Sequence, residues 1–212
     1  WKRLTNVPDR SDWERGRKSR QKAYFLYHHP KDPLRTAQLL REWLPELKAK
    51  DRGWWLEVAG RVLQPSDAAW LSDFLNDRAA SVRAKAAELL CRFPENPFTQ
   101  RCQNIAFQCV SWKGAELRLS APDPDQLSFL QSVGWKPEKQ GDWIALLMKY
   151  LPPVSWERHL EAPAAAIIEA LLEAPRPGAY LKALANSSLT FEATDWSITL
   201  LYHIVQLDRQ LQ

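Results

Sequence analysis

The sequence predicts an all-α fold in which helix pairs stack into an irregular right-handed solenoid, with one small β element near residues 115–121. The 212 residues include only 7 glycines but 15 prolines, which suits helices separated by proline stops better than a protein with many tight turns. Apolar residues recur at spacings of three and four, as in amphipathic helices. The succession of helix, tight turn, helix and proline occurs at least twice between residues 33 and 94. One such pair cannot bury its own apolar face, so stacked pairs are predicted.

The first part of the chain predicts three helical segments. A helix is expected over Trp13–Tyr27, and Pro30 and Pro33 end it because they disfavour helical backbone in the residues before them. Pro45 is expected to kink or split the next helix. Two apolar stripes mark the second and third segments, and they comprise Leu34, Ala37, Leu40, Leu44 and Leu47, then Trp55, Val58, Ala59 and Val62.

The stretch Phe74–Pro94 has a strong helix pattern. Its large apolar residues fall on one face, at i, i+4, i+7 and i+8, and they are Val82, Ala86, Leu89 and Leu90. Asp77 or Ser81 can cap the start of this helix, and Pro94 ends it. The stretch contains no residue arrangement that performs chemistry, so we interpret it as a stacking unit.

This stretch resembles the second half of a HEAT repeat, in which an Asp is followed six residues later by an Arg that comes after a Val. Asp77, Val82 and Arg83 match that signature. In HEAT repeats the Asp and the Arg tie neighbouring units together, so the resemblance implies a structural role between repeats for these residues. The wider run Pro65–Cys102 resembles an uncharacterised bacterial HEAT-repeat-like family with a similar DR-x-x-x-VR-x-x-A-x-x-LL core.

Members of that family are often encoded beside a SWIM-type zinc-finger protein, a MoxR-type AAA ATPase and a von Willebrand A-domain protein. The resemblance is best over residues 33–110 and thinner to about 173. It implies the AAA ATPase or the von Willebrand A-domain protein as a partner. It implies no catalytic residue and no cofactor.

The rhythm changes after residue 110. Leu117 and Leu119 alternate with polar residues before two prolines, which predicts a short strand or hairpin arm. Further helices are expected over residues 126–133, 142–151, 155–161, 164–173, 178–185 and 194–210. We expect a single domain over residues 1–212, with a weak boundary near residues 174–178 where the sequence reads PRPG.

Positive charge is concentrated at the N-terminus. The chain has a formal net charge of +4, and residues 1–22 alone carry +5, from eight Lys and Arg against three Asp and Glu. Residues 1–30 are interpreted as a basic arm or helix, with Arg15, Lys18 and Lys22 expected on one helix face. The candidate contacts to a nucleic acid or a protein partner are Arg15, Arg17, Lys18, Arg20 and Lys22. A solvated helix face or a partner-docking arm is the simpler interpretation, because a nucleic-acid surface needs several cations in continuity.

The sequence contains no motif for catalysis, metal binding or a cofactor. Cys102 and Cys109 share a helix face and His28 and His29 are adjacent, but neither C-x-x-C nor H-x-x-x-H occurs. No G-x-S-x-G and no phosphate-binding Gly-rich loop occurs either. The eleven tryptophans are expected mostly in the core between helices, with one or two at a surface that a partner contacts.

Composition also bears on the cellular location. Three cysteines are too few for a disulfide framework and suggest free thiols in a reducing compartment. No apolar run approaches the roughly 20 residues of a membrane span, and no signal peptide is recognisable. We therefore expect a cytoplasmic protein without membrane contact.

These observations favour a non-enzymatic protein-interaction scaffold of the bacterial cytoplasm, in which a partner lies along a groove formed by helix pairs. The alternative is a nucleic-acid-binding HEAT-like protein, such as a DNA glycosylase-like base-excision enzyme, because some alkylpurine DNA glycosylases use this architecture. A third interpretation is a structural segment of a longer chain.

Overall fold

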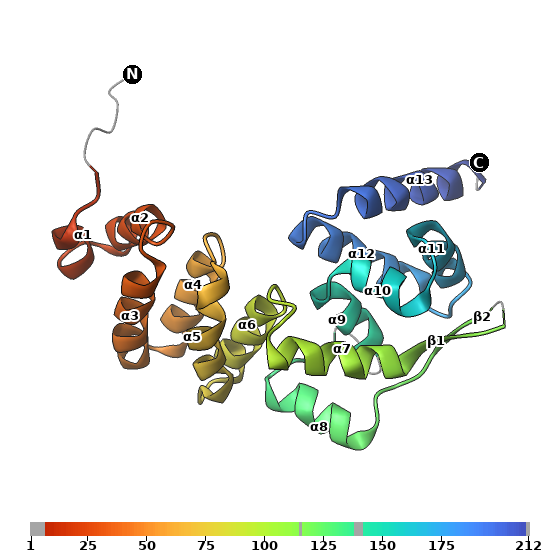
Figure 1. Cartoon of the computed structure of the whole chain (residues 1–212), viewed down its shortest axis with the longest axis horizontal. Coiled ribbons are helices and arrows are strands. Elements are labelled where there is room, and N and C mark those ends of the chain that lie inside the picture. Colours follow the sequence, from red (N-terminus) through yellow and green to blue (C-terminus); the bar gives the residue numbers. More distant parts are fainter. Residues whose placement is uncertain (1–6, 115, 138–141, 211–212) are drawn as a thin grey trace. The chain divides into compact units, whose positions relative to one another are not determined.

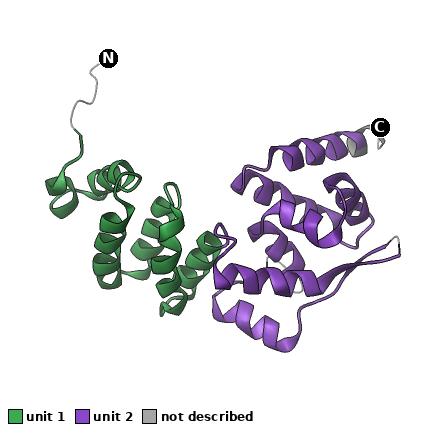
Figure 2. Ribbon diagram, in the orientation of Figure 1, with its two compact units in different colours: residues 1–90 green, residues 91–212 purple. Residues whose placement is uncertain are grey.

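The computed structural model describes residues 7–114, 116–137 and 142–210, and this part of the chain is mostly helical (Figure 1). Within these residues there are thirteen α-helices, three short 3-10 helices and one two-stranded sheet. The predicted all-α fold with a small β element is therefore confirmed. The chain forms two compact units, residues 1–90 and residues 91–212 (Figure 2), and each is described by itself.

Unit 1 is built from short helices that follow one another with little connecting chain. Its α-helices are α1 (Arg10–Glu14), α2 (Lys18–His28), α3 (Pro33–Trp43), α4 (Ala49–Ala59), α5 (Ala68–Asp73) and α6 (Ala80–Leu90). Its 3-10 helices are η1 (Leu44–Glu46), η2 (Pro65–Asp67) and η3 (Phe74–Asn76). Helix α4 packs against α2 and α6, and α5 packs against α6. Pro45 lies in η1, so the predicted interruption of the helix at this proline is confirmed.

Prolines begin helices in this chain as well as ending them. Five α-helices have proline as their first residue, and these residues are Pro33, Pro97, Pro124, Pro153 and Pro177. The fixed φ of proline suits the first helical position, where the missing N–H has no partner inside the helix to lose. Five of the fifteen prolines thus mark helix starts, a role that the prediction of proline stops did not include.

Tryptophan rings form the core around α4. Trp55 is fully buried, and its ring meets those of Trp13 and Trp43 edge-on, with centroids 5.5 and 5.3 Å away. This arrangement sets the positive edge of one ring against the negative face of another. Across both units seven tryptophans are buried, namely Trp13, Trp55, Trp70, Trp135, Trp143, Trp156 and Trp196. The prediction that most tryptophans fill the core is confirmed for the described residues.

The helix predicted over Trp13–Tyr27 is instead two helices, because the backbone breaks between α1 and α2. A capping box begins α1: the Asp9 carboxylate accepts hydrogen bonds from the N–H groups of Ser11 and Asp12, and the Asp12 carboxylate accepts one from the N–H of Asp9. Helix α1 ends at Glu14 and is only five residues long. The prediction missed this helix start because it looked for apolar spacing and not for the pair of aspartates.

Gly16 makes the break possible, and its replacement by alanine is expected to destabilise unit 1 by about 1–3 kcal/mol. A Cβ at this position would lie 2.0 Å from the carbonyl oxygen of Asp12, so the backbone of α1 would have to move. Gly53→Ala is the matched control, because a Cβ there, within α4, meets nothing within 4 Å. That change is expected to stabilise the protein by up to about 1 kcal/mol. Urea unfolding measures both, and equal effects would contradict the steric explanation.

A fully buried histidine joins three elements of unit 1. His29 follows α2, and its Nε2 lies 2.8 Å from Oδ2 of Asp67 while its Nδ1 lies 2.6 Å from Oγ1 of Thr36. The Trp70 ring N–H also donates to Asp67, at 2.7 Å. Thr36, His29 and Asp67 place a hydroxyl, a base and an acid in the order of a catalytic triad. All three residues, however, are at most 1% exposed. We assign the cluster a structural role, since buried polar groups that satisfy one another hold elements together.

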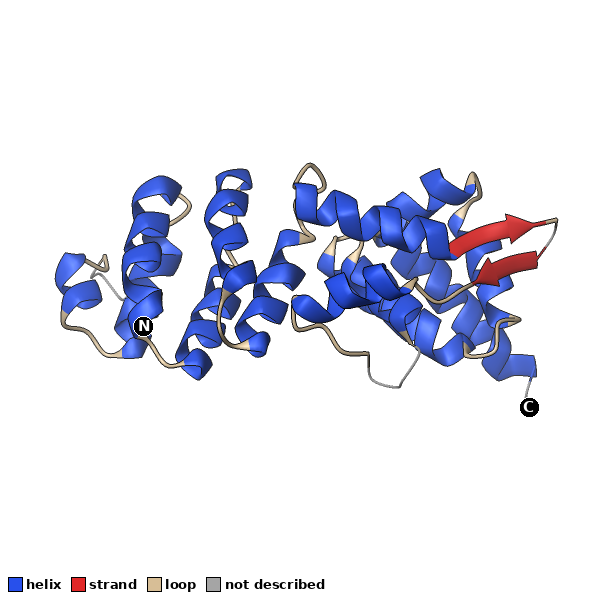
Figure 3. Ribbon diagram, turned by 90° about the horizontal axis from the view of Figure 1, so that it is seen from below, coloured by secondary structure: helices blue, strands red, loops and turns tan. Residues whose placement is uncertain are grey.

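Unit 2 contains the sheet and the longer helices. Its α-helices are α7 (Pro97–Cys109), α8 (Pro124–Ser132), α9 (Trp143–Tyr150), α10 (Pro153–Leu160), α11 (Ala164–Leu172), α12 (Pro177–Thr190) and α13 (Thr194–Gln210). Strands β1 (Val110–Lys113) and β2 (Glu116–Leu119) pair antiparallel, with Val110 opposite Leu119 (Figure 3). The β element predicted near residues 115–121 is the second strand of this hairpin, and the first strand continues directly from α7. Helix α9 packs on α12, and α13 packs on α11 and α12.

The two units divide after Leu90, at the end of α6. The weak boundary expected near residues 174–178 lies inside unit 2, between α11 and α12, which pack together. The single domain expected over residues 1–212 stays a prediction. In the described part of the chain, no helix has both the length and the apolar character that crossing a bilayer requires.

Candidate functional site

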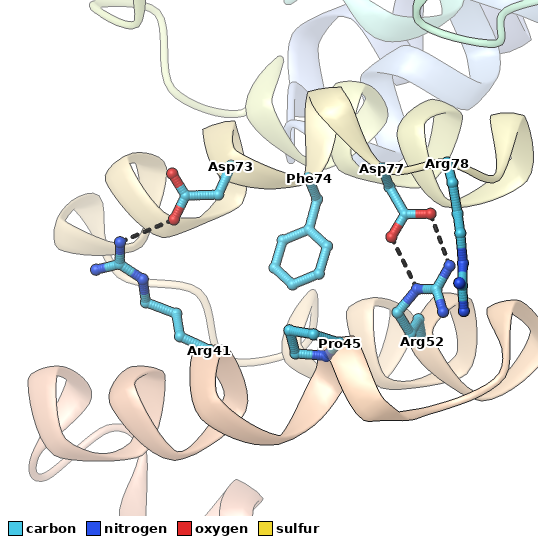
Figure 4. Close-up of a pocket in the computed structure, with 7 residues that line it drawn as sticks. All are labelled: Arg41, Pro45, Arg52, Asp73, Phe74, Asp77 and Arg78. Atoms are coloured by element: carbon cyan, nitrogen blue, oxygen red, sulfur yellow. Dashed lines mark hydrogen bonds and ion pairs between the residues drawn. The ribbon is translucent and has the colours of Figure 1, made fainter.

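Unit 1 carries an open pocket of about 460 Å³ between two layers of helices (Figure 4). One layer consists of α3, η1 and α4, and the other consists of α5, η3 and the turn that leads into α6. The described residues that line the pocket are Arg41, Pro45, Arg52, Asp73, Phe74, Asp77 and Arg78. Three arginines against two aspartates give this lining a formal charge of +1, and we call it the arginine pocket.

A buried ion pair closes one end of the arginine pocket. Arg52 on α4 is 2% exposed, and its Nε and Nη2 donate to the two carboxylate oxygens of Asp77 at 2.8 and 2.7 Å. Its Nη1 donates to the carbonyl oxygen of Leu47. Two parallel hydrogen bonds fix the orientation of both side chains, so the pair is rigid as well as charged.

The chain around Asp77 also holds its carboxylate in place. Oδ1 accepts a hydrogen bond of 2.8 Å from the N–H of Ala79, which fixes the turn that leads into α6. Burial raises the pKa of the Asp77 carboxyl, but the hydrogen bonds from Arg52 and Ala79 together outweigh it, so this pKa lies below its usual value. Asp77 is therefore ionised at neutral pH.

A second ion pair and an apolar floor complete the arginine pocket. Nη2 of Arg41 lies 2.9 Å from Oδ2 of Asp73, and both side chains are more than half exposed. An exposed pair of this kind contributes little to stability, so Arg41 can exchange Asp73 for an incoming carboxylate at small cost. Phe74, which is 7% exposed, and Pro45 lie between the two pairs (Figure 4).

Arg78 accounts for the net positive charge of the arginine pocket, because Arg41 and Arg52 are paired with Asp73 and Asp77. Its side chain is exposed, forms no ion pair within the described part of the chain, and lies beside the guanidinium of Arg52 (Figure 4). The charge of unit 1 as a whole has the same sign: residues 1–90 contain 18 Lys and Arg against 12 Asp and Glu, a formal +6, whereas residues 91–212 carry −2. The arrangement therefore suits a carboxylate or another oxyanion, which arginine binds in a planar fork.

The residues predicted to tie repeats together lie beside the arginine pocket. Val82 is fully buried on α6, as predicted. Nη1 of Arg83 donates to the backbone carbonyl oxygen of Asp77 at 2.8 Å, whereas the Asp77 carboxylate pairs with Arg52. Sequence reasoning singled out Asp77 but missed Arg52. The signal was present, because Arg52 comes three residues before buried Trp55 and so falls on the inner face of its helix.

The five predicted basic contacts lie around α1 and α2 and do not share one helix face. Arg15 follows α1 and Arg17 precedes α2, so the expected alignment of Arg15 with Lys18 and Lys22 on one helix is wrong. Lys18 pairs with Asp51 on α4, and Nη1 of Arg20 lies 3.4 Å from Oδ1 of Asp12. None of the five is among the described residues that line the arginine pocket.

The geometry does not favour a metal site or a reactive cysteine in the described residues. Within the described ranges, no three His, Cys, Asp or Glu side chains gather as a metal ion requires. The three cysteines are buried, and burial raises the pKa of the Cys109 thiol to about 11. That thiol is protonated at neutral pH and is a poor nucleophile.

Comparison with known proteins identifies a family of unknown function. A family model described as "Family of unknown function (DUF5691)" matches residues 1–212. Neither a curated protein nor a solved structure matches the chain. Any function must therefore be inferred from the chain's own residues.

Proposed function

The chain belongs to the DUF5691 family of unknown function, and from that premise we propose that it is a non-enzymatic protein-interaction scaffold. HEAT-like helical repeats form its support, and a partner segment lies across the arginine pocket of unit 1. The observation that carries the proposal is the pocket itself, in which an apolar floor separates two Arg–Asp pairs and Arg78 adds an unbalanced cation.

Interface energetics support this use of the arginine pocket. Arginine and aromatic side chains are enriched among the residues that dominate protein–protein binding. Arg52 and Asp77 are already fixed before a partner arrives, so little ordering entropy is lost on binding. The positive charge of unit 1 selects an acidic partner segment, whose carboxylates pair with Arg78 and, after displacing Asp73, with Arg41.

The proposed partner is the MoxR-type AAA ATPase or the von Willebrand A-domain protein, in the bacterial cytoplasm. Support comes from the resemblance of residues 33–110 to proteins often encoded beside these two. The arginine pocket adds a chemical requirement, which is that the partner presents an acidic segment with an apolar residue able to rest on Phe74.

Arg78→Glu is expected to weaken binding to this partner by about tenfold or more, because it places a carboxylate where the partner's carboxylate binds. Arg78 is exposed, so the circular dichroism spectrum and the melting temperature should not change. Biolayer interferometry with the purified ATPase and von Willebrand A-domain protein measures the loss, and affinity purification from nuclease-treated lysate, read by mass spectrometry, tests for other partners.

Arg61→Glu is the matched control for this experiment. Arg61 is also an exposed arginine of unit 1, lies outside the arginine pocket, and gives the same change of charge. Equal weakening by both variants would indicate general attraction between charges and would contradict the pocket. Absence of binding to either purified protein would contradict the proposed partners.

A second candidate function is nucleic-acid binding, with base excision as its enzymatic form. The observation that favours it is the formal +6 of unit 1, to which the exposed Arg15 and Arg17 contribute. Binding to a generic DNA duplex should then weaken steeply with salt, because each neutralised phosphate releases counterions. Duplex binding that is salt-independent, or unchanged in Arg15→Glu/Arg17→Glu, would contradict this candidate.

A further inference from the structure

Helix α13 presents a row of exposed apolar side chains. Ile198, Leu201 and Tyr202 are 60, 62 and 61% exposed, and Ile204 and Val205 are 45 and 46% exposed. Ile198, Leu201, Tyr202 and Val205 fall at i, i+3, i+4 and i+7, so they share one face of the helix. We call the five residues the α13 face.

The opposite side of α13 anchors the helix to unit 2. Trp196 and Leu200 are buried, and α13 packs on α11 and α12 (Figure 1). His203 points inward as well: its Nδ1 lies 2.8 Å from the carbonyl oxygen of Thr199, and its Nε2 lies 3.4 Å from Glu169. The α13 face therefore belongs to a helix that its other side already holds in place.

The α13 face supplies most of the apolar area of one half of a dimer interface. With about 150 Å² for each large side chain, at the lower end of the range for aromatic residues, the five exposed fractions leave roughly 410 Å² of apolar area. That lies within the roughly 300–600 Å² of the largest apolar patch on a typical monomer. A standard interface buries about 800 Å² per partner, of which about 65%, or roughly 520 Å², is apolar in homodimers.

Among the residues that the structure describes, the complementary surface of this kind is the α13 face of another copy. The remaining large apolar side chains that are exposed in the described residues are dispersed over other elements, and they are Val7, Tyr27, Leu34, Val154 and Leu189. The five residues of the α13 face are uncharged, so packing them against the same five residues of a second copy buries no charge. We propose that the protein forms a symmetric homodimer through α13.

Two-fold symmetry determines which residues meet. In such an interface the same patch contacts itself, so residues at its centre lie closest to the axis. The centre of the α13 face is Leu201 and Tyr202, with Ile198 on one side and Val205 on the other. Two antiparallel α13 helices would thus pack Leu201 and Tyr202 of one copy against the same pair of the second copy. This interface is independent of the arginine pocket, which lies in unit 1.

Sedimentation of the purified chain tests the proposal. The expected mass is twice the monomer's 24.5 kDa at micromolar concentration. Leu201→Glu should give the monomer with an unchanged circular dichroism spectrum, because the side chain is exposed within the protomer. Leu34→Glu, which changes a leucine of unit 1 that is 73% exposed, should remain dimeric. A monomeric wild type, or a dimer that withstands Leu201→Glu, would overturn the proposal.

A cross-link identifies the contact directly. The natural cysteines Cys91, Cys102 and Cys109 are buried, so Leu201→Cys introduces one accessible thiol per chain. Mild oxidation should then give a disulfide-linked dimer on a non-reducing gel, whereas Leu34→Cys should give far less. Equal cross-linking of the two variants would show random collision and would also overturn the proposal, as would a different protein that occupies the α13 face and holds the chain monomeric.

Discussion

Val82→Asp is expected to unfold unit 1. Val82 is fully buried on α6, which packs against α4 and α5. Its replacement forfeits about 1.5–3 kcal/mol of apolar burial and costs several kcal/mol more for a carboxylate that has no partner in the core. Because the unfolding free energy of a domain is about 5–15 kcal/mol, the loss is comparable to the whole.

Circular dichroism and hydrogen exchange followed by mass spectrometry measure this effect. Helix content should fall, and amide protection should be lost over residues 7–90. Ser81→Asp is the matched control, since Ser81 is the neighbouring residue and is exposed at the start of α6. A negative charge there is neutral or mildly stabilising. Wild-type protection in Val82→Asp would contradict the burial of this helix face.

The helices could be predicted because their causes are local. The apolar face predicted for Phe74–Pro94 is the buried face of α6, where Val82, Ala86 and Leu90 are all fully buried. Spacing along the chain is sufficient for such a prediction. The split at Pro45 is equally local, because proline removes one hydrogen bond and clashes with the preceding turn.

The arginine pocket could not be predicted in this way, since it joins residues far apart in the sequence. Asp77 carries a recognisable signature, but its partner Arg52 comes 25 residues earlier on another helix. The sequence indicates that Arg52 lies on an inner face without indicating which acid meets it. The same limit applies to Arg41 and Asp73, whose pairing depends on how α3 and α5 are placed.

The α13 face shows a third reason why the structure could not be predicted fully from the sequence. Both sides of α13 are apolar: Trp196 and Leu200 are buried, while Ile198 and Leu201 are exposed. Periodicity identifies the helix over residues 194–210 but does not rank two apolar faces. Only the packing of α11 and α12 decides which face is covered within the protomer.

Asp77→Ala is expected to lower the unfolding free energy of unit 1 by about 3–5 kcal/mol, because it leaves Arg52 buried without its counter-ion. Arg52 is 2% exposed, so most of its guanidinium is shielded from the water that would otherwise solvate it. Asp77→Asn separates the two roles of Asp77, since its amide oxygen still accepts from the N–H of Ala79 in the turn before α6. It should therefore cost less than the alanine variant.

The double change Arg52→Met/Asp77→Ala should cost much less than the two single changes combined. Removing both partners leaves no buried charge, and methionine fills the space of the arginine stem. Urea unfolding of the four proteins yields the coupling energy, which we expect to be at least about 2 kcal/mol. Additive effects would show that the two side chains act independently and would contradict the bidentate geometry.

The pH dependence of stability tests the same pair through the charge of Asp77. Hydrogen bonds from Arg52 and Ala79 hold the pKa of Asp77 below its usual value of 3.8 in spite of burial, which acts in the opposite direction. The unfolded chain therefore takes up this proton at a higher pH than the folded protein does. The stability that Asp77 contributes is complete well above pH 3.8 and declines as the pH falls through 3.8 towards the lower pKa of the folded protein.

In Asp77→Asn the acid-dependent loss of stability should be smaller than in the wild type. An identical acid profile would show that Arg52 does not stabilise the ionised carboxylate.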